Sequence, residues 1–269
     1  MNLPFHEKRR QQFLDEVYYK ARLQGDKSFL NGYKKDLETD HSLTLENKAD
    51  MTRIYANTLL TTIFTLQYTG GESIENLRNQ FDEVVDAYLE AIKQDRLFQD
   101  EPELPMFLFG YLENYLDVIR LISFAILLRR EDRIADIYSL FKDGEPDGED
   151  ALVEELLSRY LPDRPYLSEC YHDLFINLLN VTADTPAAEK IEDMKLYLKE
   201  WYSEMEQTAF YDSHLEQAAD GSGGYYGYWA FEAGAIAYLY DLDDSAFADH
   251  LIYPKDLVDF AKNFPDAAI

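Results

Sequence analysis

The chain has 269 residues, 46% of them hydrophobic and 14% aromatic, which is enough to bury a sizeable core as one large domain or as two packed halves. Acidic side chains outnumber basic ones by 52 to 25, so the formal net charge is −27. A charge of this sign repels nucleic acid and anionic membranes and attracts basic partners. The one cysteine, Cys170, excludes an internal disulfide framework and a multi-cysteine metal site, and a reduced cytoplasmic setting fits best.

The negative charge is unevenly distributed along the chain. Residues 1–60 carry 10 basic and 9 acidic side chains, whereas residues 201–269 carry 13 acids against two lysines, a net of −11. Two interpretations are open. Either the charge serves only solubility, or it steers a basic partner toward the acidic C-terminal half.

Apolar residues recur at three- and four-residue steps over most of the chain, which is the periodicity of amphipathic helices. In chain order, this spacing first predicts a helix over 51–66 that Gly70 and Gly71 end. It then predicts a helix over 74–92 that Ser73 caps.

Three further apolar stretches follow the same periodicity. The stretch 104–129 is apolar on most sides and is predicted to be a central buried helix, because charged residues interrupt it too often for a membrane span. Thr185 is predicted to cap a helix that begins at Pro186 and carries a core stripe over 191–205. No run shows the two-residue alternation of a strand.

We therefore predict an all-α fold of two abutting helical halves that form one compact helical unit. The clearest seam is KDGEPDGED, residues 142–150, which combines two glycines, a proline and five acids. It divides the chain into an N-terminal helical domain over 1–141 and a C-terminal helical domain over 150–269. The segment DGSGG at 220–224 predicts a shorter loop within the C-terminal half.

The seam also resembles a calcium-binding loop. Residues of suitable type occupy positions 1, 3, 5, 6 and 12 of that template: Asp143, Glu145, Asp147, Gly148 and Glu154. Against a calcium site, Pro146 stiffens the loop, Asp150 occupies a position that is normally apolar, and no second loop pairs with it. Acidic linkers match such templates by chance, so we interpret 143–154 as an acidic linker and predict no metal or cofactor.

Catalytic groups other than carboxylates are scarce. His172 and Asp173 form a pair of the kind found in metal phosphohydrolases, but the chain has only five histidines and none lies four residues from another. Cys170 precedes His172 by two residues, so on a helix the two side chains point apart. We predict no enzymatic activity. A metal-dependent hydrolase that uses carboxylates near 143–154 and His172 is kept as an alternative.

The stretch YYGYWAFEAGAIAYLYDLDD, residues 225–244, is apolar nearly all round and carries Glu232 in its middle. On a helix, Glu232 falls inside the apolar surface, where an unpaired charge is costly. We predict that its carboxyl group is protonated or paired, with Arg120 as the first candidate partner. Its role is then structural rather than catalytic.

The order of GYWAFEAGAIAYLYDLDD, a short gap and YPKDLVDFAK resembles the C-terminal domain of the PoNi family, immunity proteins that neutralise PoNe-type DNase toxins. Trp229, Glu232, Tyr253 and Pro254 are among the matching residues, and we predict structural roles for these four. The stretch RRQQFLDEVYYKARL is similar to that family's N-terminal domain. The resemblance implies a cytoplasmic antidote, used in bacterial competition, that inactivates a DNase delivered through a secretion system.

A DNase presents basic groups to DNA phosphates, so an acidic helical protein is suited to occupy that basic surface. We place the contact in the acidic C-terminal half and predict partner-binding roles for six carboxylates: Asp212, Glu216, Asp220, Asp241, Asp243 and Asp244. The resemblance assigns no toxin-contacting residues. An acidic helical scaffold for a different basic partner is the remaining alternative.

Overall fold

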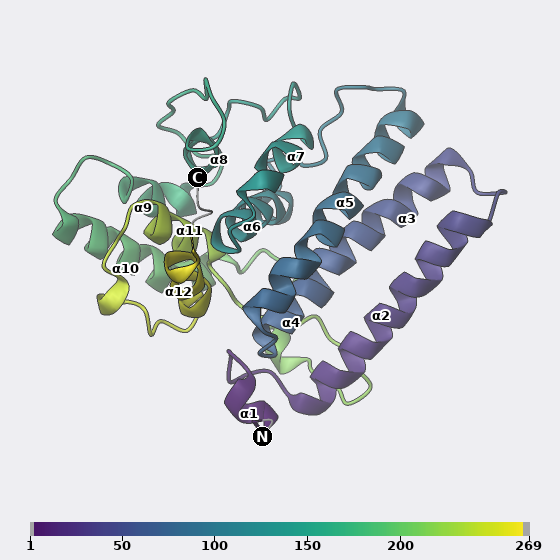
Figure 1. Cartoon of the computed structure of the whole chain (residues 1–269), viewed down its shortest axis with the longest axis horizontal. Helices are drawn as coiled ribbons and strands as arrows, with labels where there is room; N and C mark the ends of the chain where they lie inside the picture. Colours follow the sequence, from purple (N-terminus) through teal and green to yellow (C-terminus); the bar gives the residue numbers. More distant parts are fainter. Residues whose placement is uncertain (1–2, 266–269) are drawn as a thin grey trace. The chain divides into compact units, whose positions relative to one another are not determined.

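A computed structural model describes residues 3–265, and these residues form helices and loops without any strand (Figure 1). The all-α prediction is confirmed. The chain divides into two compact units. Unit 1 comprises Met1–Met106 and Ala209–Gly227, and unit 2 comprises Phe107–Thr208 and Tyr228–Ile269. The acidic segment at which the sequence suggests a domain boundary lies inside unit 2.

Unit 1 is built on three long helices that run side by side, with α3 packed against both α2 and α5 (Figure 1). Its helical elements are α1 (Phe5–Lys8), α2 (Glu16–Thr39), α3 (Leu45–Asn57), the π-helical turn η1 (Thr58–Thr65), α4 (Leu66–Thr69), α5 (Ile74–Gln99) and the 3-10 turn η4 (Ser213–Leu215).

Polar side chains fix where the long helices of unit 1 begin. Asp15 accepts hydrogen bonds from the backbone N–H groups of the first turn of α2, and Thr44 does the same for α3. The predicted cap at Ser73 is confirmed, since its Oγ accepts from Asn76 N at 3.2 Å. The predicted helix over 51–66 corresponds to the end of α3 and to η1, where the backbone switches to π-helical hydrogen bonding.

The returning segment 209–227 lies against α2. The hydroxyl of Tyr18 on α2 donates to the carbonyl oxygen of Tyr225 at 2.9 Å, and Arg22 Nη1 donates to the carbonyl oxygen of Gly223 at 3.0 Å. Gly221 has a φ of +86°, and a Cβ at that position would lie 2.7 Å from Arg22 N. Glycine is required there because it alone combines the positive φ with this close approach to α2.

Unit 2 is organised around α6 (Leu112–Leu127), whose residues from Val118 onward are all buried. Helix α11 (Phe231–Leu239) packs on α6 and on α12 (Lys255–Asn263), and α10 (Ala187–Glu204) packs on α9 (Ile176–Asn180). The remaining elements are η2 (Glu131–Arg133), α7 (Ile134–Ser139), α8 (Ala151–Ser158), η3 (Asp173–Phe175) and η5 (Asp244–Ala246).

Two predicted helix boundaries in unit 2 are wrong. The central helix begins at Leu112 rather than near 104, because 104–111 form turns. Pro186, not Thr185, is the N-cap residue of α10, and no side chain caps that end. In the apolar stretch 225–244, only 231–239 are helical, so Trp229 precedes the helix. Residues 225–237 other than Tyr226 are buried, which accounts for their apolar composition without a long helix.

A bilayer span needs a helix that is both long and strongly apolar. None of the helices formed by residues 3–265 meets both requirements.

Candidate functional site

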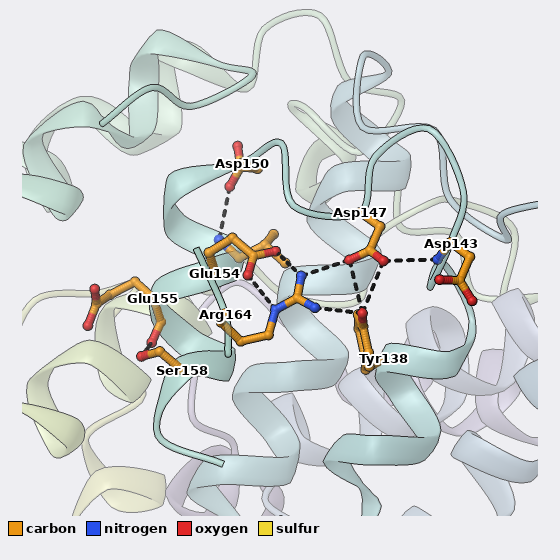
Figure 2. Close-up of polar contacts among 9 residues, drawn as sticks. Tyr138, Asp143, Asp147, Asp150, Glu154, Glu155, Ser158 and Arg164 are labelled. Carbon is orange, nitrogen blue, oxygen red and sulfur yellow. Dashed lines mark hydrogen bonds and ion pairs between the residues drawn. The ribbon is translucent and has the colours of Figure 1, made fainter. Parts of the chain in front are cut away.

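A buried arginine ties the acidic segment 142–150 to α8 (Figure 2). Arg164 forms two hydrogen bonds with the Glu154 carboxylate, from Nε at 2.5 Å and from Nη2 at 2.6 Å. The same Nη2 donates to Asp147 Oδ1 at 2.7 Å, and Nη1 donates to the hydroxyl of Tyr138 at 2.5 Å. The guanidinium lies over the Tyr138 ring, 4.5 Å from its centroid. We call these four residues the Arg164 clamp.

Asp150 makes a second attachment close to the clamp. Its side chain is fully buried and caps α8, with Oδ1 accepting from Val153 N at 2.9 Å (Figure 2). Oδ1 also accepts from the Tyr115 hydroxyl at 2.8 Å, and Oδ2 accepts from Tyr171 N at 2.9 Å. One carboxylate therefore fixes the start of α8 and the chain beyond residue 170.

The clamp gives the acids of the calcium-loop template a different role. Asp147 and Glu154, at template positions 5 and 12, both bind the Arg164 cation. Asp143 at position 1 uses its backbone N–H to donate to Asp147 Oδ2 at 2.9 Å. Within residues 3–265, no group of three or more His, Cys, Asp or Glu side chains is arranged to hold a metal ion. The segment is thus a folded part of unit 2, where the sequence suggests a linker.

His172, the other residue of the hydrolase alternative, is packed among aromatic rings. Its Nε2 lies 2.8 Å from the carbonyl oxygen of Phe109, and its ring contacts Tyr115 edge-on. The imidazole and the clamp carboxylates are each engaged with protein groups of their own. Burial and the nearby Asp150 raise the pKa of Cys170 to about 12, so its thiol stays protonated at neutral pH.

Asp147 is the clamp acid with a shifted pKa. Partial burial alone would raise the pKa of its carboxyl group, but the hydrogen bonds from Asp143 N, Arg164 and Tyr138 hold it below its usual range. The stability that this depressed pKa contributes is present above the unfolded-state pKa of the group. It is lost as pH falls through the folded-state pKa.

Glu232 on α11 is 2% exposed and accepts hydrogen bonds from two aromatic residues of α10. Tyr197 donates its hydroxyl to Glu232 Oε1 at 2.5 Å, and Trp201 donates Nε1 to the same oxygen at 3.1 Å. Burial raises the pKa of Glu232, against the opposing effects of these hydrogen bonds and of the Arg120 charge. The ion pair of Arg120 is formed with Asp117 at 2.8 Å, so Arg120 acts on Glu232 as a nearby charge.

The six predicted contact acids fall into two groups in different units. Asp212, Glu216 and Asp220 belong to unit 1, and Asp241, Asp243 and Asp244 belong to unit 2. All except Asp244 are exposed.

Three of these acids also stabilise local structure. Asp220 accepts from Ser222 N at 2.9 Å and Asp243 accepts from Ser245 N at 3.1 Å, so each holds its own turn. Asp244 accepts from the Tyr253 hydroxyl at 3.0 Å and lies 3.6 Å from the Lys262 ammonium group. Glu216 is the exposed acid best suited to test a role in partner binding alone, because Asp212 and Asp241 have positive φ values of 55° and 48°.

Unit 1 contains an acidic groove that sequence reasoning missed. It has a volume of about 590 Å³ and is lined by side chains of α2, α3 and α5, with five acids and one lysine among them: Glu38, Asp82, Glu83, Asp86, Glu90 and Lys34. Thr52 on α3 is buried beneath them. The sequence shows four of these acids at helical spacing on α5, but only the packing of three helices shows that they line a concave surface.

Comparison with known proteins assigns both parts of the chain to one family. Residues 10–137 match the family described as PoNe immunity protein (PoNi), N-terminal, and residues 148–257 match PoNe immunity proteins (PoNi), C-terminal. The chain belongs to the PoNi family. The acidic segment 142–150 falls largely between the two matches. A search of curated proteins found no match for the chain.

The fold of this PoNi chain also occurs in a solved structure. The crystal structure of protein PA2201 from Pseudomonas aeruginosa superposes with a TM-score of 0.74 over 94% of this chain and 90% of that one. The two sequences are 20% identical, so this likeness establishes a shared fold alone.

The motif that carries the PoNi resemblance lies in the packed core of unit 2. A Cβ at Gly234 on α11 would lie 2.7 Å from the Pro254 ring and 3.1 Å from Val258 of α12, so glycine allows the two helices to approach. Trp229 is 6% exposed and stacks on Phe231, with ring centroids 6.0 Å apart. The structural roles of Trp229, Glu232, Tyr253 and Pro254 remain predictions.

Proposed function

We propose that this PoNi chain binds a PoNe-type DNase toxin stoichiometrically in the cytoplasm and neutralises it by occupying its basic surface, without an enzymatic step. The observation that carries the proposal is the pair of family matches over 10–137 and 148–257, which together span most of the chain. The formal net charge of −27 supports it, because a nuclease must present cationic groups to DNA phosphates.

The acidic surface supplies attraction over distance. Charge complementarity of this kind raises association rates toward about 10⁸–10⁹ M⁻¹s⁻¹ at low ionic strength and loses its effect as salt is added. We place first contacts at the six predicted acids, with Glu216 as the position at which charge reversal disturbs the fold least.

The direct test is DNA cleavage by the toxin encoded beside this gene, titrated with the purified chain. We expect cleavage to stop near one molar equivalent, with no effect on an unrelated DNase at the same concentrations. If cleavage by the neighbouring toxin continues undiminished and no binding is detected at large excess of the chain, the proposed function is wrong. Complete inhibition by far less than one molar equivalent of the chain would instead indicate a catalytic mechanism.

A further inference from the structure

Tyr166 projects from the surface of unit 2. Tyr166 is 91% exposed, more than any other large hydrophobic side chain in residues 3–265; the next is Leu215 at 73%. Isolated exposed hydrophobic residues are common on protein surfaces and by themselves indicate nothing. What distinguishes Tyr166 is how its loop is held.

The loop of residues 162–170, which we call the Tyr166 loop, has no regular secondary structure from 164 onward but is fixed at both ends. At its start, Arg164 is the centre of the clamp and its side chain is only 9% exposed (Figure 2). At its end, the carbonyl oxygen of Glu169 accepts from Ala151 N at 2.9 Å, next to the Asp150 attachment. Pro162 and Pro165 further restrict the backbone.

This arrangement keeps the loop ordered before any partner arrives. Ordering a loop at an interface costs conformational entropy, and a loop that is already fixed contributes more of its contact energy to affinity. The buried ion pairs that hold Arg164 therefore serve to present the residue two positions later along the chain.

The surroundings of the Tyr166 loop are acidic. Asp163 and Glu169 are exposed within the loop, and Glu145 and Glu149 are exposed on the segment that the clamp holds beside it. The backbone at Gly148 adjoins the loop, since a Cβ there would lie 3.7 Å from Pro165. Burial and the charges of Glu145 and Glu149 raise the pKa of the Tyr171 hydroxyl just beyond the loop.

We propose that Tyr166 is the aromatic anchor of the contact with the toxin, inserting its ring among lysine and arginine side chains of the basic surface while the acids around it pair with the same cations. This inference rests on the proposed function. A tyrosine offers a rigid, amphipathic surface that packs against apolar side-chain stems and takes cation–π contacts from arginine. Such aromatic anchors carry most of the energy in many interfaces, whereas the charges around them mainly set association rate and specificity.

The test compares two exposed tyrosines of unit 2, Tyr166→Ala and Tyr111→Ala. Tyr111 is 66% exposed and serves as the matched control. Binding is measured by surface plasmon resonance against the immobilised toxin encoded beside the gene, with thermal melting of each variant. We expect Tyr166→Ala to raise Kd by about tenfold or more, mainly through faster dissociation, with an unchanged melting temperature. Tyr111→Ala should stay within about twofold of the wild type.

Two more variants examine the ring and the rigidity of the loop. Tyr166→Phe retains the ring and should raise Kd by about threefold or less. Pro165→Gly retains Tyr166 but loosens its loop, so it should raise Kd measurably.

Failure of the inference is distinguishable from failure of the proposed function. If the wild type binds and inhibits but Tyr166→Ala binds as the wild type does, or no more weakly than Tyr111→Ala, the anchor assignment is overturned while the function stands. If Pro165→Gly binds unchanged, the preorganised loop is wrong. If the wild type does not bind the toxin, the proposed function fails and the anchor with it.

Discussion

Replacing Arg164 by methionine, Arg164→Met, removes the cation of the clamp and retains much of the side-chain volume. The loss of folding stability arises mainly at Glu154, whose side chain is 2% exposed and accepts two hydrogen bonds from Arg164. Asp147 keeps its hydrogen bonds from Tyr138 and from Asp143 N. Removing one partner of a buried ion pair costs about 3–5 kcal/mol. This is a large fraction of the roughly 5–15 kcal/mol by which folded proteins are stable.

Urea unfolding followed by tryptophan fluorescence is a selective assay for this prediction. Both tryptophans, Trp201 and Trp229, are buried in unit 2 together with Arg164. With a urea dependence near 3 kcal/mol per molar, the loss corresponds to a midpoint lowered by about 1–2 M. The control is Arg159→Met, which removes an exposed cation near the Tyr240 ring and should cost less than about 1 kcal/mol.

A second substitution separates the buried charge from the lost packing. Adding Glu154→Gln to Arg164→Met replaces the stranded carboxylate by a neutral amide and should recover part of the stability, because a neutral group is less costly to bury. If Arg164→Met costs no more than Arg159→Met, or if Glu154→Gln lowers stability further in the double variant, the clamp does not hold unit 2 as described.

Three further predictions concern the buried carboxyl, the helix contact and the contact acids. Burial raises the pKa of Glu232, so the stability that it contributes is fully present below the unfolded-state pKa and is lost as pH rises through the folded-state pKa. Glu232→Gln should remove this loss. In urea unfolding at neutral pH, the variant should therefore gain stability relative to the wild type. Gly234→Ala should cost about 1–3 kcal/mol because its Cβ meets Pro254, whereas Gly25→Ala in α2, where the Cβ meets open space, should stabilise by about 0.5–1 kcal/mol. Charge reversal at all six predicted contact acids should slow toxin association in low salt and matter less in high salt.

Each of these predictions has a result that contradicts it. A constant stability difference between Glu232→Gln and the wild type across pH would mean that Glu232 does not titrate with a raised pKa in the folded protein. Equal effects of alanine at 234 and at 25 would show that the contact with Pro254 can relax. Association with the toxin that is unchanged in low salt after the six reversals would place the interface elsewhere.

The fold class was predictable because helical periodicity is a local property of the sequence. Ser73 was likewise predictable, since an N-cap acts on a backbone N–H three residues away. The start of α6 was not, because the apolar stretch continues toward the N-terminus through 104–111, where the chain is not helical and only Phe107 and Phe109 are buried. An apolar composition does not by itself fix whether the backbone is helical.

The clamp was beyond sequence reasoning for a different reason. Arg164 lies ten residues from Glu154 and 17 from Asp147, separations that correspond to no helical or hairpin spacing. The acids alone matched a calcium template, and only folding supplied the cation that they bind. The hydrogen-bond donors to Glu232 were missed in the same way, since Tyr197 and Trp201 reach it from α10, while Arg120 contributes a nearby charge.

Folding also changes how the net charge is displayed. In unit 2 the side chains of Arg120, Arg129, Arg130, Arg133 and Arg164 are at most 17% exposed, and each lies within ion-pair distance of a carboxylate. These five guanidinium groups are thus largely shielded from solvent and hold loops and helix ends. The exposed acids therefore dominate the electrostatic field around unit 2. Under the proposed function, such a field would attract a basic toxin but fix no single orientation, since long-range attraction is weakly directional. Orientation and slow dissociation would then require a desolvated contact, and the exposed ring of Tyr166, on a loop anchored at both ends, provides a surface suited to making one.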